Sequence, residues 1–278
     1  MAGQHRAPLP PVERLSPACI RILGGNPGKF TLQGTNTYLL GTGRQRILID
    51  TGEGRQAWLD SLKATLESEA ATVQTALISH WHQDHTGGIA QLQSLAPGAT
   101  IFKMDPAPGQ SPIEDGQVFR VDGVTLTAVH TPGHTVDHVV FVLEEEDAMF
   151  TADNVLGHGT AVFEDLAVYL ASLSKMRTLF SGRAYPGHGP VVENGPARIA
   201  EYVAHRRQRE QQVLEVMSSK AAAWSAMDIV KVVYRDVPDS LHAAACGGVV
   251  QILDKLQREG RVAGVGDEWG LVGDKPVL

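Results

Sequence analysis

Short apolar runs, alternating or continuous, dominate the first half of the chain and predict β-strands separated by glycines and polar turns. These runs lie at 35–40, 46–50, 75–79, 99–103, 117–121, 124–130, 138–143 and 148–153. Two intervening stretches repeat apolar residues every three or four positions, which predicts helices at 54–70 and 88–95. Strands and helices interleaved in this way predict a mixed α/β fold.

The second half of the chain is mainly helical in its periodicity. The expected helices lie at 165–180, 196–219, 225–234 and 241–259. Two apolar runs follow, 261–265 and 268–272, and Gly266 and Asp267 between them are typical of a hairpin turn. Two helices and a hairpin predict a winged-helix-like unit. The expected parts are a flexible tail at 1–14, a main domain at 15–219 and a winged-helix-like C-terminal domain at 220–278.

Composition and charge narrow the functional class. The chain has 278 residues, of which 43% are hydrophobic and 20% charged, as in globular proteins. Its 24 Lys and Arg against 31 Asp and Glu leave a net charge of −7, which argues against DNA or an anionic membrane as partner. No uncharged apolar run is long enough to span a bilayer. The start lacks the apolar segment of a signal peptide, and Cys19 and Cys246 are isolated, so we expect a cytoplasmic protein.

The decisive segment, Ser-His-Trp-His-Gln-Asp-His-Thr-Gly-Gly, directly follows the predicted strand at 75–79. It carries His80, His82, Asp84 and His85, a mixture of imidazole and carboxylate that suits zinc, iron or manganese. Residues two apart in an extended loop point the same way, so His80 and His82 can share one ion. Asp84 and His85 fall on the next bend and can reach a second ion.

Further ligands follow three later strands or turns. His134 stands in Thr-Pro-Gly-His-Thr, Asp153 ends the strand at 148–153, and His188 stands in Pro-Gly-His-Gly. Seven ligands are too many for one structural zinc, which closes with four, so a binding module with a structural or lost site is the weaker alternative. His130 and His138 flank the His134 turn. Either one could support a ligand by pairing with a carboxylate, or be an ordinary polar loop residue.

Together, His-x-His-x-Asp-His, Thr-Pro-Gly-His-Thr, the Asp-terminated strand and Pro-Gly-His-Gly resemble the metallo-β-lactamase superfamily. The resemblance implies an αβ/βα sandwich with two zinc ions, for which manganese or iron could substitute. It assigns His80, His82 and His134 to the first metal, Asp84, His85 and His188 to the second, and Asp153 to a bridging position. One departure is Ala152, where relatives commonly have glycine.

The resemblance also implies hydrolysis by a metal-bound hydroxide, with Asp84 orienting the nucleophile or taking its proton. The segments at 26–38 and 157–166 and the tail look like the lactamase-beta-2-like subgroup, which includes fungal thioesterases and single-strand endoribonucleases. Similarity to the thioesterases favours release of a polyketide from the acyl carrier protein domain of its synthase, in secondary metabolism. His158 is a candidate substrate contact.

RNA cleavage is the alternative activity, and charge bears on it. Residues 221–278 contain six Lys and Arg against eight Asp and Glu, a balance of 6 − 8 = −2, whereas a nucleic-acid-binding winged helix normally has a basic face. The basic cluster at 205–209 could be a solvated helix face, or could meet an acidic carrier protein.

Overall fold

A computed structural model describes residues 7–219 and 222–273 and divides into two compact units. The first comprises the chain up to Glu164 together with Ala171–Ala200, and the second comprises Asp165–Leu170 and the chain from Glu201 onward. The division thus falls inside the long helix α5 (Gly195–Ser218), earlier than the predicted 219/220 boundary. The physical reason is that Glu210 of this helix pairs with Lys255 and Arg261 in the C-terminal part.

The first unit contains a seven-stranded sheet in the order β1 to β7. Its strands are β1 (Val12–Ser16), β2 (Cys19–Leu23), β3 (Asn36–Leu40), β4 (Gln45–Ile49), β5 (Thr72–Leu77), β6 (Thr100–Lys103) and β7 (Ser111–Pro112). Strands β1 to β4 are antiparallel, and β4 to β7 are parallel. The predicted tail at 1–14 is therefore too long, because Val12 and Arg14 pair with β2; residues 1–6 lie outside the described residues.

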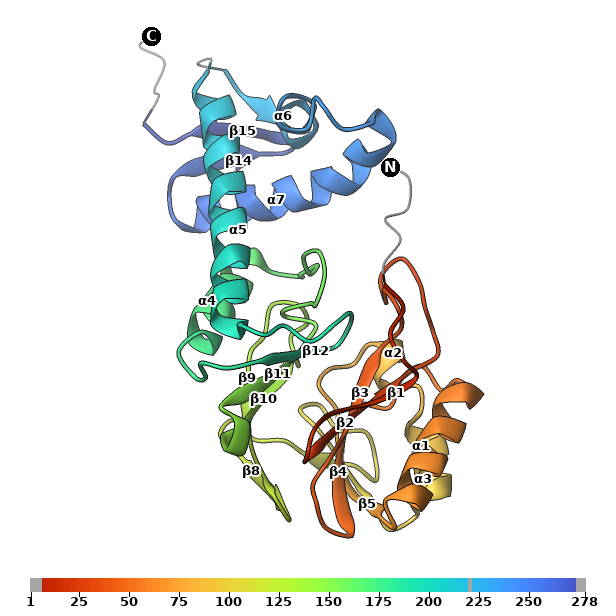
Figure 1. Cartoon of the computed structure of the whole chain (residues 1–278). Helices are drawn as coiled ribbons and strands as arrows, with labels where there is room; N and C mark the ends of the chain where they lie inside the picture. Colours follow the sequence, from red (N-terminus) through yellow and green to blue (C-terminus); the bar gives the residue numbers. More distant parts are fainter. Residues whose placement is uncertain (1–6, 220–221, 274–278) are drawn as a thin grey trace. The chain divides into compact units, whose positions relative to one another are not determined.

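Helices α1 (Gln56–Ser68) and α3 (Ile89–Leu95) lie beside this sheet (Figure 1). The three-to-four spacing of their apolar residues turns Trp58, Leu62 and Leu92 to one side, where they pack on Ile22 and Leu48 of the sheet. The short helix α2 (Gln83–Thr86) follows β5 and carries part of the histidine-rich segment.

The second sheet of this unit is five-stranded, in the order β12-β11-β10-β9-β8. Its strands are β8 (Val118–Val121), β9 (Val124–His130), β10 (Val139–Leu143), β11 (Ala148–Ala152) and β12 (Ala184–Pro186). A core between the sheets joins Tyr38 and Leu77 of the first to Phe141, Phe150 and Tyr185 of the second. Helix α4 (Leu166–Met176) covers the other side, where the Ser172 hydroxyl donates to the Pro132 carbonyl. Two sheets with helices outside confirm the expected αβ/βα sandwich.

The second unit has a three-stranded sheet in the order β13-β15-β14 with helices α6 and α7. Its elements are β13 (Trp224–Ser225), α6 (Ala226–Val233), η2 (Asp239–Leu241), α7 (His242–Arg258), β14 (Val262–Val265) and β15 (Glu268–Leu271). The Ser225 hydroxyl caps α6 by accepting a hydrogen bond from the Asp228 amide. This arrangement confirms the winged-helix-like unit. Among residues 7–219 and 222–273, we find no helix whose length and hydropathy would let it cross a bilayer.

Candidate metal centre

All seven predicted ligands converge at one end of the sandwich, in segments that follow strands, and two of them lie in the short helix α2. His80, His82, Asp84 and His85 come after β5, His134 after β9, Asp153 directly after β11 and His188 directly after β12. Strands from both sheets therefore end at the same place, which is why ligands more than one hundred positions apart can meet. An isolated β-bridge between Thr35 and His188 ties the two sheets together here.

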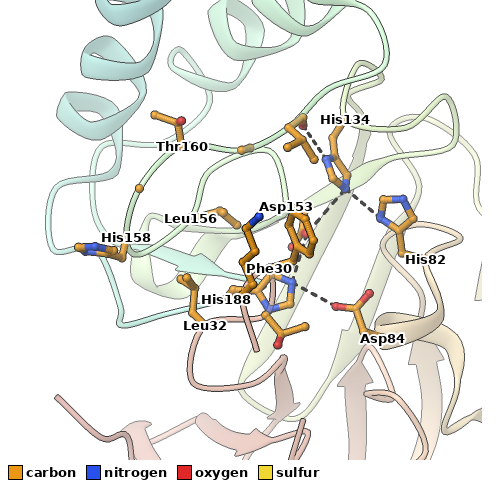
Figure 2. Close-up of a pocket in the computed structure, with 15 residues that line it drawn as sticks. Phe30, Leu32, His82, Asp84, His134, Asp153, Leu156, His158, Thr160 and His188 are labelled. Atoms are coloured by element: carbon orange, nitrogen blue, oxygen red, sulfur yellow. Dashed lines mark hydrogen bonds and ion pairs between the residues drawn. The ribbon is translucent and has the colours of Figure 1, made fainter. Parts of the chain in front are cut away.

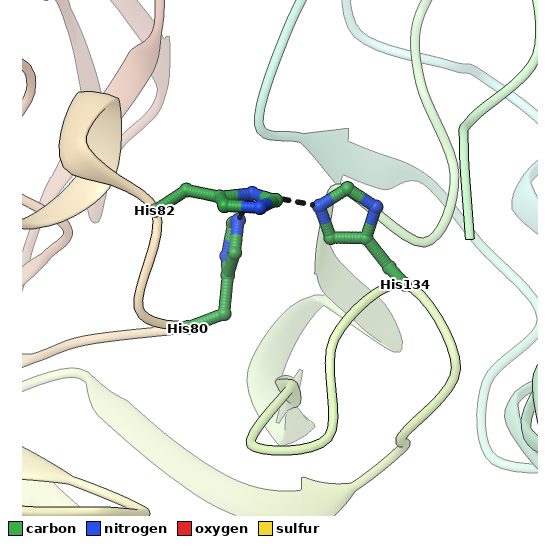
Figure 3. Close-up of side chains that lie close together, drawn as sticks. All are labelled: His80, His82 and His134. Carbon is green, nitrogen blue, oxygen red and sulfur yellow. Dashed lines mark hydrogen bonds between the residues drawn. The ribbon is translucent and has the colours of Figure 1, made fainter. Parts of the chain in front are cut away.

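Three imidazoles face one point (Figure 3). His82 Nδ1 lies 2.9 Å from His80 Nε2 and 3.1 Å from His134 Nε2. All three ligand atoms fall within 4.8 Å of one another. Three imidazole nitrogens that converge in this way match the three protein ligands of a catalytic zinc site.

A second group of ligands, Asp84, His85 and His188, lies beside the first. Asp84 Oδ2 is 3.2 Å from His188 Nε2 and 3.4 Å from His85 Nε2. Asp153 lies between the two groups, with Oδ2 3.7 Å from His134 Nε2 and 3.2 Å from His188 Nε2. Its position is that of a carboxylate able to contact two cations.

Two buried polar atoms show that these residues fit a metal. Within the described part of the chain, His85 Nε2 and Asp153 Oδ1 are buried and make no hydrogen bond. They lie 3.4 Å apart, at the centre of the cluster. Leaving buried polar atoms unsatisfied is costly, and a divalent cation would satisfy both.

The electrostatics of the cluster also suit cations. Burial lowers the pKa of His80 well below its ordinary value, so that imidazole is neutral and its lone pair is available. Burial alone would raise the pKa of Asp153, but the imidazoles of His188 and His85 lower it, so the carboxylate is ionised. Burial would likewise lower the pKa of His188, yet the Asp153 carboxylate raises it to about 9. Metal binding at His188 must therefore displace a proton.

Sequence reasoning missed Asp50, which holds two parts of the site in place. Its Oδ2 lies 2.7 Å from His85 Nδ1 and accepts a hydrogen bond from the Ser79 hydroxyl at 2.8 Å. Its backbone has φ of 59°, a left-handed conformation that is strained for an aspartate and is held here by these contacts. The available signal was its place at the end of a predicted strand, the same place that Asp153 occupies in the other sheet.

Other neighbours orient the ligands. The Thr35 hydroxyl donates to Asp84 Oδ2 at 3.1 Å, and His134 Nδ1 donates to the Val162 carbonyl at 2.8 Å. Of the two histidines left open by the sequence, His138 contacts a ligand, because its Nε2 lies 3.3 Å from the Asp153 amide nitrogen. His130 instead contacts the Val136 carbonyl.

Backbone geometry near Asp153 explains why position 187 is a glycine and how the chain accommodates Ala152, its departure from the family pattern. A Cβ on Gly187 would lie 2.3 Å from Asp153 Oδ1, so no larger residue fits beside this carboxylate. Ala152 has φ of 41°, a conformation that favours glycine. The methyl group of Ala152 is accommodated, and the ligand next to it keeps its place in the cluster.

A cavity of about 340 Å³ opens from these ligands. Its wall is formed by five of the ligands and by two loops, at 29–32 and 156–162. His158, the predicted substrate contact, lies on this wall, on the side opposite His82 and Asp84 (Figure 2). The structure therefore brings His158 to the same cavity as the ligands but not into the cluster.

Comparison with known proteins shows which family shares this fold and these motifs. Residues 30–101 and 94–188 match the model of the metallo-beta-lactamase superfamily, and residues 225–269 match that of the beta-lactamase associated winged helix domain. The lactamase-like protein ptaB of Pestalotiopsis fici is 46% identical over 274 residues, 94% of this chain and 87% of that protein. The atrochrysone carboxyl ACP thioesterase AgnL7 of Paecilomyces divaricatus is 43% identical over 275 residues, 95% of this chain and 88% of that protein.

A solved structure shares the fold over nearly the whole chain. A beta-lactamase domain protein from Burkholderia ambifaria superposes with a TM-score of 0.80 and 19% identity, covering 97% of this chain and 96% of that one. The histidine and aspartate cluster, the sandwich and the winged helix thus have one explanation. The chain belongs to the metallo-β-lactamase superfamily of hydrolases and carries the winged-helix domain associated with it.

Proposed function

We propose that this protein is a dinuclear metal hydrolase that cleaves the thioester of a polyketide bound to an acyl carrier protein, releasing the product in secondary metabolism. The observation that carries the proposal is the 43% identity to AgnL7 across 95% of this chain, together with the seven clustered ligands. The partner is then the carrier protein domain of a polyketide synthase. We keep zinc as the proposed metal and the cytoplasm as the proposed location.

The reaction adds water to the thioester carbonyl, breaks the C–S bond and yields a carboxylic acid and the carrier thiol. Two divalent cations, when bound, would lower the pKa of the attacking water and stabilise the oxygen that gains charge. His80, His82 and His134 would hold one cation, Asp84, His85 and His188 the other, with Asp153 shared. Asp84 is ionised, since its contacts with His188 and His85 outweigh burial and lower its pKa. As an ionised acceptor it can orient the attacking water, and its lowered pKa makes it a weak base for the proton of that water.

RNA cleavage is less well supported, because the basic cluster at 205–209 is partly occupied by contacts within its own unit. The Arg209 guanidinium lies 4.3 Å from the centre of the Tyr234 ring. Arg206 is half-buried on the same helix. A continuous track for phosphates would need such cations free on one exposed face.

In the experiment, the purified protein is loaded with zinc or manganese and is tested on two substrates in parallel. One substrate is an acyl thioester on a phosphopantetheine carrier protein, and the other is a labelled single-stranded RNA. Asp84→Ala and His82→Ala variants exclude contaminating activities. Metal-dependent thioester release that is lost in both variants, with RNA intact, supports the proposal. RNA cleavage lost in the same variants, with the thioester untouched, refutes it. Metal analysis by mass spectrometry tests the expected two ions per chain.

A further inference from the structure

The cavity has two ends, and the chemistry proposed above uses only one of them. Its ligand end is formed by His82, Asp84, His134, Asp153 and His188. The rest of its wall, the second end, is built by two loops, at 29–32 and 156–162, and the Val162 carbonyl of the second loop also accepts a hydrogen bond from His134 Nδ1. Figure 2 shows Leu156, His158 and Thr160 on the side of the cavity away from His82 and Asp84. This second end is where the wall of the cavity can contact the acyl group attached to the reacting carbonyl.

The second end exposes apolar side chains that a ligand would cover. Phe30 is 71% exposed and Val162 is 60% exposed, although both line the cavity. Leu32, Leu156 and Ala161 add further apolar side chains to the wall of the same cavity. A large exposed aromatic side chain at a cavity mouth marks a binding surface, because its water is released when a ligand packs on it.

A cation stands beside the exposed ring. Lys29 Nζ lies 5.4 Å from the centre of the Phe30 ring, within the range of a cation–π contact. Among the residues that the structure describes, no carboxylate lies within ion-pair distance of this ammonium. None of the residues that line this end of the cavity is acidic. The charge of Lys29 is thus available to an anionic oxygen of a ligand packed on Phe30.

We propose that Lys29 and Phe30 are specificity-determining residues that select a flat, aromatic acyl group bearing an anionic oxygen. A planar ring offers Phe30 a large contact area at little entropic cost, and an acidic oxygen on that ring reaches the Lys29 ammonium. This inference rests on the proposed thioesterase function and adds which acyl group is preferred and by which residues.

An RNA base with its phosphate could also engage an aromatic ring and a lysine. The apolar part of the wall, Leu32, Leu156 and Val162, favours the acyl group because it offers nothing to a sugar-phosphate backbone, whereas Thr31, His158 and Thr160 are the polar members of the wall. RNA is therefore one of the outcomes that the test separates.

The test uses the metal-loaded full chain and three thioesters of N-acetylcysteamine. One carries a naphthoyl group with a carboxylate on the remote ring, the second carries plain naphthoyl, and the third carries octanoyl. The variants are Lys29→Gln and Phe30→Leu. Lys63→Gln on the exposed surface of α1 is the matched control, and Phe30→Tyr, which keeps the ring, is the conservative variant.

Lys29→Gln is expected to raise KM for the carboxynaphthoyl thioester about tenfold, the loss of one charge-assisted contact, with kcat and the plain naphthoyl KM unchanged. Phe30→Leu is expected to raise KM for both ring substrates and to leave octanoyl unaffected. Lys63→Gln should behave like the unaltered protein, and Phe30→Tyr should restore the affinity for both ring substrates that Phe30→Leu loses. A non-hydrolysable amide analogue of the carboxynaphthoyl thioester, titrated by calorimetry, should show the same losses of affinity.

Three results would overturn the inference. If every variant hydrolysed the three thioesters with the same relative KM values as the unaltered protein, neither residue would have a selective role, although the thioesterase function would stand. If the amide analogue bound both variants with unchanged affinity, the selective role of both residues would also be refuted. Weakened binding of single-stranded RNA in both variants, with no effect on the analogue, would assign the two residues to RNA. Failure of the proposed function is distinguished by the absence of hydrolysis of all three thioesters.

Discussion

At the scale of single residues, the site depends on side chains that touch ligands rather than metal. Asp50 is buried and contacts His85, and His138 lies against the amide of Asp153. Such contacts fix the direction in which a ligand's free atom points. In the histidine-rich segment, residue type alone predicts the ligands, whereas no comparable sequence pattern predicts these supporting residues.

Replacing Asp50 with asparagine should weaken metal binding, because the amide cannot match the charge that the carboxylate places on His85 Nδ1. We expect a 10- to 100-fold loss of affinity, the usual effect of losing such a partner. Competition with a chromophoric chelator measures it. Asp60→Asn, at an exposed position on α1, is the control and should bind metal normally. Equal affinity in both variants would show that Asp50 serves only the fold.

Cys19 should be inert to thiol reagents in the folded protein. Burial raises the pKa of its thiol, and the Glu146 carboxylate adds to the effect. The thiolate is therefore scarce even at pH 8 to 9, where an ordinary cysteine ionises. In a Cys246→Ser variant, a colorimetric thiol assay should detect nothing over this pH range until denaturant is added. Rapid labelling of the native variant would contradict the burial of Cys19.

At the scale of elements, ion pairs join the second half of α5 to the C-terminal unit. Glu210 contacts Lys255 at 2.6 Å and Arg261 at 2.8 Å, and its side chain is only 14% exposed. Burial alone would lower the pKa of Lys255, but its hydrogen bond with Glu210 raises it. These contacts explain why the helix belongs to both units, which its uniform periodicity could not reveal.

Glu210→Gln should destabilise the C-terminal unit by about 2 kcal/mol, between the values typical of exposed and buried pairs. Trp224 and Trp269 pair in the sheet of this unit, so tryptophan fluorescence during denaturant unfolding reports on it. The control is Glu193→Gln, which removes the exposed pair with Arg183 and should change little. The role given to Glu210 fails if the two variants unfold alike.

At the scale of the whole molecule, the candidate metal ligands come from both sheets of the sandwich. Ligands after β5 belong to one sheet, and those after β9, β11 and β12 belong to the other. A cation held by residues of both sheets would therefore crosslink the sheets in addition to its proposed role in hydrolysis. Binding to the folded state alone stabilises a protein in proportion to the logarithm of metal concentration over Kd.

Removing metal should lower the thermal midpoint of unfolding and abolish hydrolysis. At a metal concentration of about 100 times Kd, the expected stabilisation is roughly 2.7 kcal/mol per site. Calorimetry with and without a chelator, followed by readdition of zinc, measures the change. His158→Ala should respond as the unaltered protein does, whereas His188→Ala should respond less. If the thermal midpoint of unfolding were the same with and without the chelator, the cluster would hold no ion.

Local patterns were enough to predict most elements of the fold. The main strands and helices of both units follow from apolar spacing, since burial on one face repeats with the period of the element. Two strands, β2 and β12, were not predicted. Of the others that escaped this reasoning, β1 lies partly in a stretch interpreted as a tail, and the two-residue strands β7 and β13 are too short to show a period. Their pairing partners, not their own residues, make them strands.

The sequence by itself determined which residue types could bind metal, because His80, His82, Asp84 and His85 cluster in one loop, and the motifs around His134, Asp153 and His188 match one superfamily. Tertiary structure alone decided which side chains support them and what lines the cavity. Asp50, Thr35 and the pair Lys29–Phe30 acquire their roles from strands and loops distant in the chain. Whether a side chain can bind metal depends on its residue type, which the sequence shows, whereas a supporting contact exists only once folding has brought two segments together.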